Sequence, residues 1–172
     1  MTRIIKNRAV VEDSWSVLRL AEGETADTID LPQGPVLVPL SVWHARKSAL
    51  LAASSPAAPV GVWLAAGEGP ESLADDLAQL SVIAVDFPKF TDGRGYSAAR
   101  LLRERFGYQG EIRAIGDVLP DQLFLMARCG INAFALRADK DADKALALFD
   151  TFKTPYQAAV DQPQPLFRRR AA

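Results

Sequence analysis

Charged side chains and glycines are concentrated in one segment, which directly follows the most apolar run of the sequence. The segment reads Asp86-Phe87-Pro88-Lys89-Phe90-Thr91-Asp92-Gly93-Arg94-Gly95-Tyr96-Ser97. Glycines let the backbone approach a ligand closely, and unpaired N–H groups at a helix N-terminus attract anions. Lys89 and Arg94 would add positive charge to such a site. The segment therefore predicts a site for an anionic ligand, such as a phosphate, a carboxylate or a sulfur oxyanion.

Further candidates follow the next two expected strands, because ligands of parallel α/β sheets bind at the carboxyl ends of the strands. We expect Asp86, Asp117 and Arg137 to lie at one rim of the sheet. The full set of candidate ligand-binding residues is Asp86, Lys89, Asp92, Gly93, Arg94, Gly95, Tyr96, Ser97, Asp117, Gln122 and Arg137.

An ordinary structural explanation exists for the same residues. Asp92-Gly93 and Arg94-Gly95 are common turn sequences, and Ser97 is a common helix cap. The length of the expected loop, Pro88 to Tyr96, favours a functional role, since connections in α/β units usually have about 2–6 residues. Gly93-x-Gly95-x-x-Ala98 also resembles a dinucleotide-binding pattern, but residues 88–92 separate its first glycine from the strand, which weakens the match.

Rare residue types exclude several kinds of chemistry. The chain has one cysteine, Cys129, and one histidine, His44, so it forms no internal disulfide. No spacing typical of a zinc site occurs, and one thiol cannot hold an ordinary iron–sulfur cluster. We expect no metal and no cofactor, and the sequence names no catalytic residue. His44 is predicted to face solvent, and Cys129 to be a small buried apolar residue.

Short apolar runs alternate with helical patterns from Pro35 onward, which predicts an α/β fold with about five parallel strands. Expected strands are residues 36–38, 60–64, 81–87, 111–115 and 133–136; expected helices are 42–53, 71–80, 97–106, 120–129 and 141–152. Two arrangements fit these elements. We favour a flavodoxin-like open sheet with helices on both faces. The alternative is a (βα) half-barrel with strands in sequential order and helices on one side.

The 172 residues predict a single α/β domain over residues 1–154, in which residues 1–34 form a short N-terminal segment of strands and loop. Residues 155–172 carry three prolines and Arg168-Arg169-Arg170, so we expect an extended C-terminal tail. That tail is either a frayed terminus or a docking segment for an acidic partner, with Leu166 and Phe167 as apolar anchors.

A formal net charge of −1 argues against nucleic acid as a partner. The N-terminus lacks the apolar stretch of a signal peptide and no run is long enough to span a bilayer, so we expect a cytoplasmic protein that binds no membrane.

Two stretches resemble the signature of an uncharacterised bacterial family, domain-of-unknown-function family 934. One runs from Asp86 through Ser97 to Arg103, and the other is Gly110-Glu111-Ile112-Arg113-Ala114-Ile115-Gly116-Asp117-Val118-Leu119 with Asp121-Gln122-Leu123 and Arg128-Cys129-Gly130 after it. Pro120 and Ile131-Asn132 depart from the residues usual in the family.

The resemblance implies a bacterial protein commonly encoded beside assimilatory sulfite reductase and often labelled a probable oxidoreductase. It carries over no catalytic residue. We therefore expect an accessory protein of sulfite reduction that binds the reductase or its electron donor, with Arg100, Arg103 and Arg105 on a basic helix as part of the contact. The alternative is a small enzyme or sensor that binds an anionic metabolite or nucleotide at the Asp86–Ser97 loop.

Overall fold

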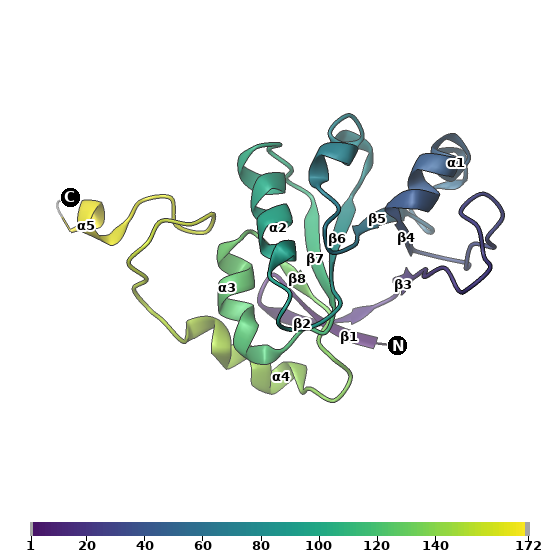
Figure 1. Cartoon of the computed structure of the whole chain (residues 1–172). Coiled ribbons are helices and arrows are strands. Elements are labelled where there is room, and N and C mark those ends of the chain that lie inside the picture. The colour runs from purple at the N-terminus through teal and green to yellow at the C-terminus, as the bar shows by residue number, and fades with distance from the viewer. Residues whose placement is uncertain (1, 171–172) are drawn as a thin grey trace.

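One eight-stranded sheet organises residues 2–170, the part of the chain that the computed structural model describes (Figure 1). The strands are β1 (Thr2–Lys6), β2 (Ala9–Asp13), β3 (Ser16–Val17), β4 (Val36–Pro39), β5 (Val60–Leu64), β6 (Val82–Phe87), β7 (Glu111–Gly116) and β8 (Ala133–Phe134). Their order across the sheet is β2-β1-β8-β7-β6-β5-β4-β3. Strands β3 to β8 are parallel to one another, and the β1–β2 hairpin joins β8 in antiparallel fashion.

The parallel strands follow one another in sequential order, so the α/β class and the half-barrel alternative are confirmed. The flavodoxin-like arrangement that we favoured is wrong, since it needs a reversal of strand order that does not occur. Right-handed crossovers in sequential order bring every connecting helix to the same face of the sheet. Those helices are α1 (Leu40–Ala53), α2 (Arg94–Glu104) and α3 (Leu123–Arg128). The second face is covered by the N-terminal segment instead.

The sheet curls because its two outermost strands are joined by a very short connection. β2 and β3 lie at opposite ends of the strand order, yet only Ser14 and Trp15 separate them in sequence. Such a connection spans about 10 Å at most. One end of β2 therefore lies close to the start of β3, and the chain between them passes across the concave face of the half-barrel. Trp15 packs there against an apolar cluster of Leu37, Trp63, Val82, Ala84 and Ile115.

A buried ion network joins the hairpin to the centre of the sheet on this concave face. Arg113 of β7 is 3% exposed, and its Nη1 lies 3.0 Å from both carboxylate oxygens of Asp13 in β2. The Arg113 Nε donates to Glu111 Oε1 at 2.6 Å, and Lys6 Nζ lies 2.7 Å from Glu111 Oε2. The Arg113 guanidinium also lies 5.6 Å from the centre of the Trp15 ring. Charge pairing thus replaces the helix layer that a doubly wound fold would place on this face.

Several helices differ from the sequence prediction. The helix expected over 71–80 is two 3₁₀ turns, η1 (Pro70–Leu73) and η2 (Leu77–Gln79). The other expected helices are divided or shifted: α2 begins at Arg94, η3 (Pro120–Gln122) precedes α3, and α4 (Ala142–Ala145) continues into η4 (Leu146–Asp150). Within residues 2–170, no helix combines the length and the apolarity that a membrane span requires.

The C-terminal tail leaves the body of the protein beside α3 and extends away from it, in yellow in Figure 1. Within residues 155–170, its one helix is the short α5 (Leu166–Arg169). The last two residues of the predicted tail lie outside the described part of the chain.

Candidate functional site

The carboxyl ends of β6, β7 and β8 surround a pocket of about 450 Å³, which we call the mouth pocket because it opens at the end of the half-barrel. Its lining consists of Arg19, Asp86, Phe87, Pro88, Gly116, Asp117 and Arg137. The predicted meeting of Asp86, Asp117 and Arg137 at one rim therefore occurs. Binding at this rim is typical of parallel sheets, where the loops after the strands supply the contacts.

One wall of the mouth pocket is an ion pair between Arg19 and Asp86. Asp86 lies at the end of β6 on the concave face, and its Oδ1 accepts from Arg19 Nη2 at 2.7 Å. The guanidinium of Arg19 lies 4.8 Å from the centre of the Trp63 ring, a stacking that fixes its orientation. Trp63 Nε1 donates to the carbonyl of Leu18 at 2.9 Å, which holds the segment carrying Arg19 against the sheet.

Sequence reasoning missed Arg19. It belongs to a segment far from the glycine-rich loop, and no local pattern marks it. Only the curl of the sheet, which follows from the short β2–β3 connection, brings that segment to the end of β6. The one feature of the sequence that could have indicated it was Trp15. A large apolar ring in the N-terminal segment suggests that this segment packs against the rest of the protein.

The opposite wall is an ion pair between Asp117 and Arg137. Asp117 Oδ1 accepts from Arg137 Nη1 at 3.0 Å, and Arg137 also donates to Asp139 from Nε and Nη2, at 2.7 and 3.1 Å. Hydrogen bonds to Asp139 and then to Asp117 hold the pKa of the Arg137 guanidinium above its ordinary value. Arg137 therefore carries its charge at every physiological pH. Gly116, with φ of +92°, lies between the two walls and adds no side chain to the space.

Two of the predicted residues, Asp117 and Gln122, hold the loop between β6 and α2. The backbone N–H of Phe90 donates to Asp117 Oδ2 at 2.9 Å, and the carbonyl of Phe90 accepts from Gln122 Nε2 at 2.7 Å. Gln122 thus positions the loop. Because α2 begins at Arg94, the connection comprises only residues 88–93, a length within the roughly 2–6 residues common in α/β units. The argument from unusual loop length is therefore wrong.

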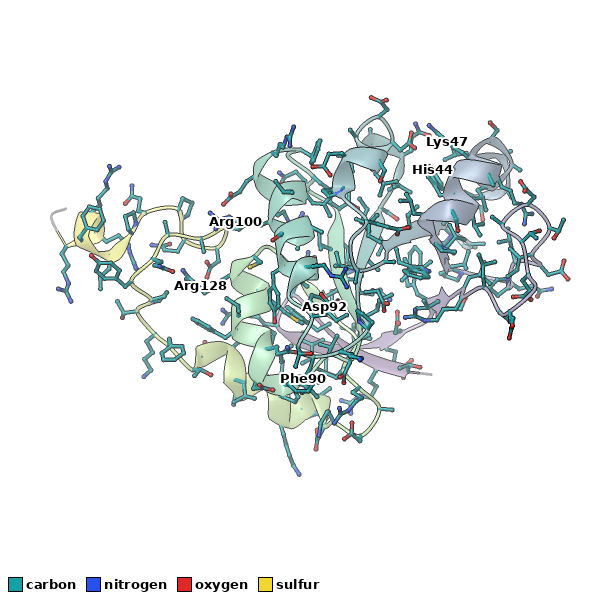
Figure 2. All side chains as sticks on the ribbon, viewed as in Figure 1. His44, Lys47, Phe90, Asp92, Arg100 and Arg128 are labelled. Carbon is teal, nitrogen blue, oxygen red and sulfur yellow. The ribbon has the colours of Figure 1, made fainter. Side chains whose placement is uncertain are left out.

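Asp92 occupies the helix N-terminus where we expected an anionic ligand. Its Oδ1 accepts from the backbone N–H of Arg94 at 3.1 Å, and both of its oxygens accept from the Arg94 guanidinium, at 3.0 and 2.6 Å. These hydrogen bonds lower the pKa of Asp92 to about 2. The two charges neutralise each other. Figure 2 shows Asp92 and Phe90 at the same end of α2.

Gly95 and Tyr96 pack α2 onto the sheet. A Cβ atom on Gly95 would lie 2.7 Å from the Phe87 ring, so the glycine allows close contact between helix and strand. The Tyr96 ring meets Phe87 edge-on at 5.3 Å between ring centres, and burial raises the pKa of its hydroxyl. The resemblance of Gly93-x-Gly95-x-x-Ala98 to a dinucleotide pattern therefore has a packing explanation.

The remaining predicted residues lie away from the mouth pocket. Lys89 and Ser97 are exposed and line no part of it. Ser97 and Arg94 instead border a separate groove of about 210 Å³ beside Gly67 and Pro70. Of the predicted set, the structure brings Asp86, Asp117 and Arg137 together and distributes the others over the loop and α2.

The single histidine and the single cysteine lie outside the loop. His44 is exposed on α1 (Figure 2), and Cys129 is half-buried, with a thiol pKa that burial raises. In the described residues, no group of three or more His, Cys, Asp and Glu side chains is placed to hold a metal ion. Arg103 turns inward and donates to three carbonyls, those of Gly130, Tyr108 and Gly110, so it is not part of a free basic face.

Fold and site together define an α/β half-barrel protein with a polar pocket at the carboxyl ends of its central strands. A family model described as "Bacterial protein of unknown function (DUF934)" matches residues 61–167, more than half of the chain, and the chain belongs to this family. The matched region contains Asp86, Asp117 and Arg137, whereas Arg19 precedes it. No curated protein and no solved structure matches the chain.

Proposed function

We propose that this protein is an accessory protein of assimilatory sulfite reduction. In this proposal it works in the cytoplasm in sulfur assimilation and cysteine biosynthesis, and it binds sulfite reductase or the electron donor of that enzyme. Family membership supports the pathway, through the association with sulfite reductase that the resemblance implies. The observation that carries the docking role is the shape and chemistry of the C-terminal tail.

The tail is anchored at its base and presents a contact surface further along. Arg128 of α3 donates from Nη2 to the carbonyl of Gln157 at 2.5 Å, and the N–H of Val160 donates to the carbonyl of Arg128 at 3.1 Å. Tyr156 comes just before this anchor and Phe167 after it, and both are exposed, with their ring centres 6.5 Å apart. Figure 2 shows Arg128 at the side of the body from which the tail leaves.

Aromatic and arginine side chains dominate the binding energy of many protein interfaces. Phe167 adjoins the exposed Arg168 and is followed by the exposed Arg170, so α5 offers one apolar anchor and positive charge at one place. A partner that suits it has an apolar pocket surrounded by carboxylates. Such an interface forms faster at low salt, because charge complementarity steers the encounter.

The direct test measures binding of the full chain to purified sulfite reductase and, separately, to its electron donor. We expect the double variant Phe167→Ala, Arg168→Glu to weaken binding at least about tenfold, the equivalent of about 1.4 kcal/mol. Lys144→Glu is the matched control, since it reverses one exposed charge on α4, outside both the tail and the expected basic contact on α2. Equal binding by the wild type and the double variant would contradict a docking role of the tail.

A genetic test addresses the pathway independently of the tail. Deletion of the gene is expected to lower sulfite reductase activity and to slow growth without added cysteine. Unchanged reductase activity together with unchanged cysteine prototrophy would refute the proposed pathway.

A second candidate function is that of a small enzyme or sensor for an anionic metabolite or nucleotide. The observation that favours it is the mouth pocket, in which the side chains of Arg19 and Arg137 remain 49% and 44% exposed. Thermal-shift measurements with sulfite, sulfate, nucleotides, flavins and free metabolites test it. Arg137→Gln is expected to abolish any stabilisation, and Arg94→Gln, outside the pocket, to preserve it. Absence of stabilisation by every compound would refute this second function.

A further inference from the structure

Charges of both signs line the mouth pocket in equal number. Arg19 and Arg137 contribute two guanidinium groups, and Asp86 and Asp117 contribute two carboxylates. Each wall holds one group of each sign, since Arg19 pairs with Asp86 and Arg137 pairs with Asp117. The formal charge of the lining is therefore zero, although four of its seven residues are charged.

This balance of charges determines which ligands gain Coulomb energy when they enter the mouth pocket. A simple anion is attracted by the two guanidinium groups and repelled by the two carboxylates at comparable distances, so its net Coulomb gain is small. A simple cation meets the same cancellation with the signs exchanged. A ligand with one positive and one negative group gains at both ends, provided that each group faces its opposite charge.

The lining has unused hydrogen-bonding capacity for both groups. Arg137 donates three of its five N–H groups, and among the described side chains the Arg19 guanidinium donates hydrogen bonds to Asp86 alone. On Asp86, Oδ1 accepts one short hydrogen bond, while the Oδ2 contact to Arg19 is 3.4 Å long. Because a carboxylate oxygen accepts two hydrogen bonds, Asp86 has room for an ammonium donor. Asp86 is reached from the pocket because its side chain forms part of the lining.

We infer that the mouth pocket binds a small zwitterion, of the class of free α-amino acids. The ligand carboxylate contacts the free N–H groups of Arg137 and Arg19, and the ligand ammonium group contacts Asp86. A volume of about 450 Å³ accommodates such a molecule with its side chain. The inference rests on the second candidate function, ligand binding at this pocket, and specifies the ligand class.

The test uses the full chain and calorimetric or thermal-shift titration with each common L-amino acid. The amino acid that binds best is then compared with its deaminated analogue, which keeps only the acid, and with its decarboxylated analogue, which keeps only the amine. We expect each analogue to bind at least about tenfold more weakly, a difference of about 1.4 kcal/mol.

Variants provide the sharper readout. Asp86→Asn removes one negative charge, so it is expected to weaken binding of the amino acid and to strengthen binding of the deaminated acid. Arg137→Gln is expected to weaken both. Asp92→Asn, which alters a carboxylate of the neighbouring loop outside the pocket, is the control and leaves both affinities unchanged. Urea unfolding of each variant establishes that it folds.

The outcomes separate the two levels of the proposal. A deaminated acid, sulfite or another simple anion that binds as tightly as the best amino acid would overturn the zwitterion inference and leave ligand binding at the mouth pocket standing. Failure of every compound to bind would overturn both. Binding that Asp86→Asn leaves unchanged would also refute the inference, because it would place the ligand elsewhere.

Discussion

Gly116 has a φ angle of +92° at the end of β7, where an added Cβ atom would overlap the carbonyl oxygen of Phe87 and lie 2.8 Å from Asp86 Oδ1. Gly116→Ala is therefore expected to lower the free energy of unfolding by about 1–3 kcal/mol, measured by urea denaturation. Gly93→Ala is the control, since no atom lies within 4 Å of its added Cβ. An equal loss in both variants would contradict the steric explanation.

Asp92 provides a test of electrostatics at the residue scale. Hydrogen bonds from Arg94 lower the pKa of this carboxyl from 3.8 to about 2. Since the folded-state pKa lies below the unfolded value, the pair stabilises the fold above about pH 4 and loses this effect as the pH falls towards 2. A carboxyl titration followed by NMR is expected to give a pKa of about 2 for Asp92 and a higher pKa in Arg94→Gln, which removes the guanidinium and keeps the backbone N–H donor. A pKa that Arg94→Gln leaves unchanged would disprove the assignment.

Part of the candidate site could be predicted from the sequence, because charged residues at the ends of expected strands were visible there. Asp86, Asp117 and Arg137 follow consecutive parallel strands, and the rule for such sheets places their side chains at one rim. Arg19 could not be predicted, because its place depends on the curl of the whole sheet. Asp92 and Arg94 were misjudged because a sequence does not show that two opposite charges satisfy each other.

At the scale of elements, a buried carboxylate joins residues 70–80, which form two 3₁₀ turns, to α1. Asp76 is 5% exposed and accepts a hydrogen bond from Trp43 Nε1 at 2.7 Å and another from Lys47, both on α1. Burial alone would raise the pKa of Asp76, but these hydrogen bonds outweigh burial and lower it. The apolar pattern over 71–80 predicted a helix because sequence periodicity does not reveal a long-range contact of this kind. Strand positions were predicted better, since they depend on local apolar runs.

The contact between α1 and the 3₁₀ turns can be tested with Trp43→Phe, which keeps an aromatic ring and removes the N–H donor. Because the hydrogen bond is made to a buried charged group, we expect a loss of about 1.5–3 kcal/mol in the free energy of unfolding. Amide hydrogen exchange of residues 70–80 is expected to accelerate at the same time. Ser48→Ala changes an exposed residue on the same helix and serves as the control; exchange that is equally fast in this variant would contradict the role of Asp76.

At the scale of the whole molecule, Arg113 connects the N-terminal hairpin to the centre of the sheet. Arg113→Met keeps much of the side-chain volume and leaves Asp13 buried without its cation. Removing one partner of a buried ion pair costs about 3–5 kcal/mol, and we expect a loss of this size in urea denaturation. Arg100→Met removes an exposed ion pair with Glu104 and is expected to cost less than about 0.5 kcal/mol. Similar losses in the two variants would show that the buried network does not hold the hairpin.

Strand order was the part of the fold that the sequence predicted least well. Apolar runs in β4 to β7 indicate strands covered on both faces, and both helices and the chain's own N-terminal segment can provide that cover. The deciding feature is the short connection between β2 and β3, which becomes informative only once the strand order is known. Trp15 and Arg113 then have a clear role on the concave face.

The pairing of β1 with β8 also sets the order in which the protein can complete its structure during synthesis. Ile5 pairs with Phe134, so the first strand to leave the ribosome has no place in the sheet until nearly all other strands have emerged. Contacts so distant in sequence form slowly. The nascent hairpin and Trp15 therefore keep apolar side chains exposed until then, and the concave face closes only after β8 has been synthesised.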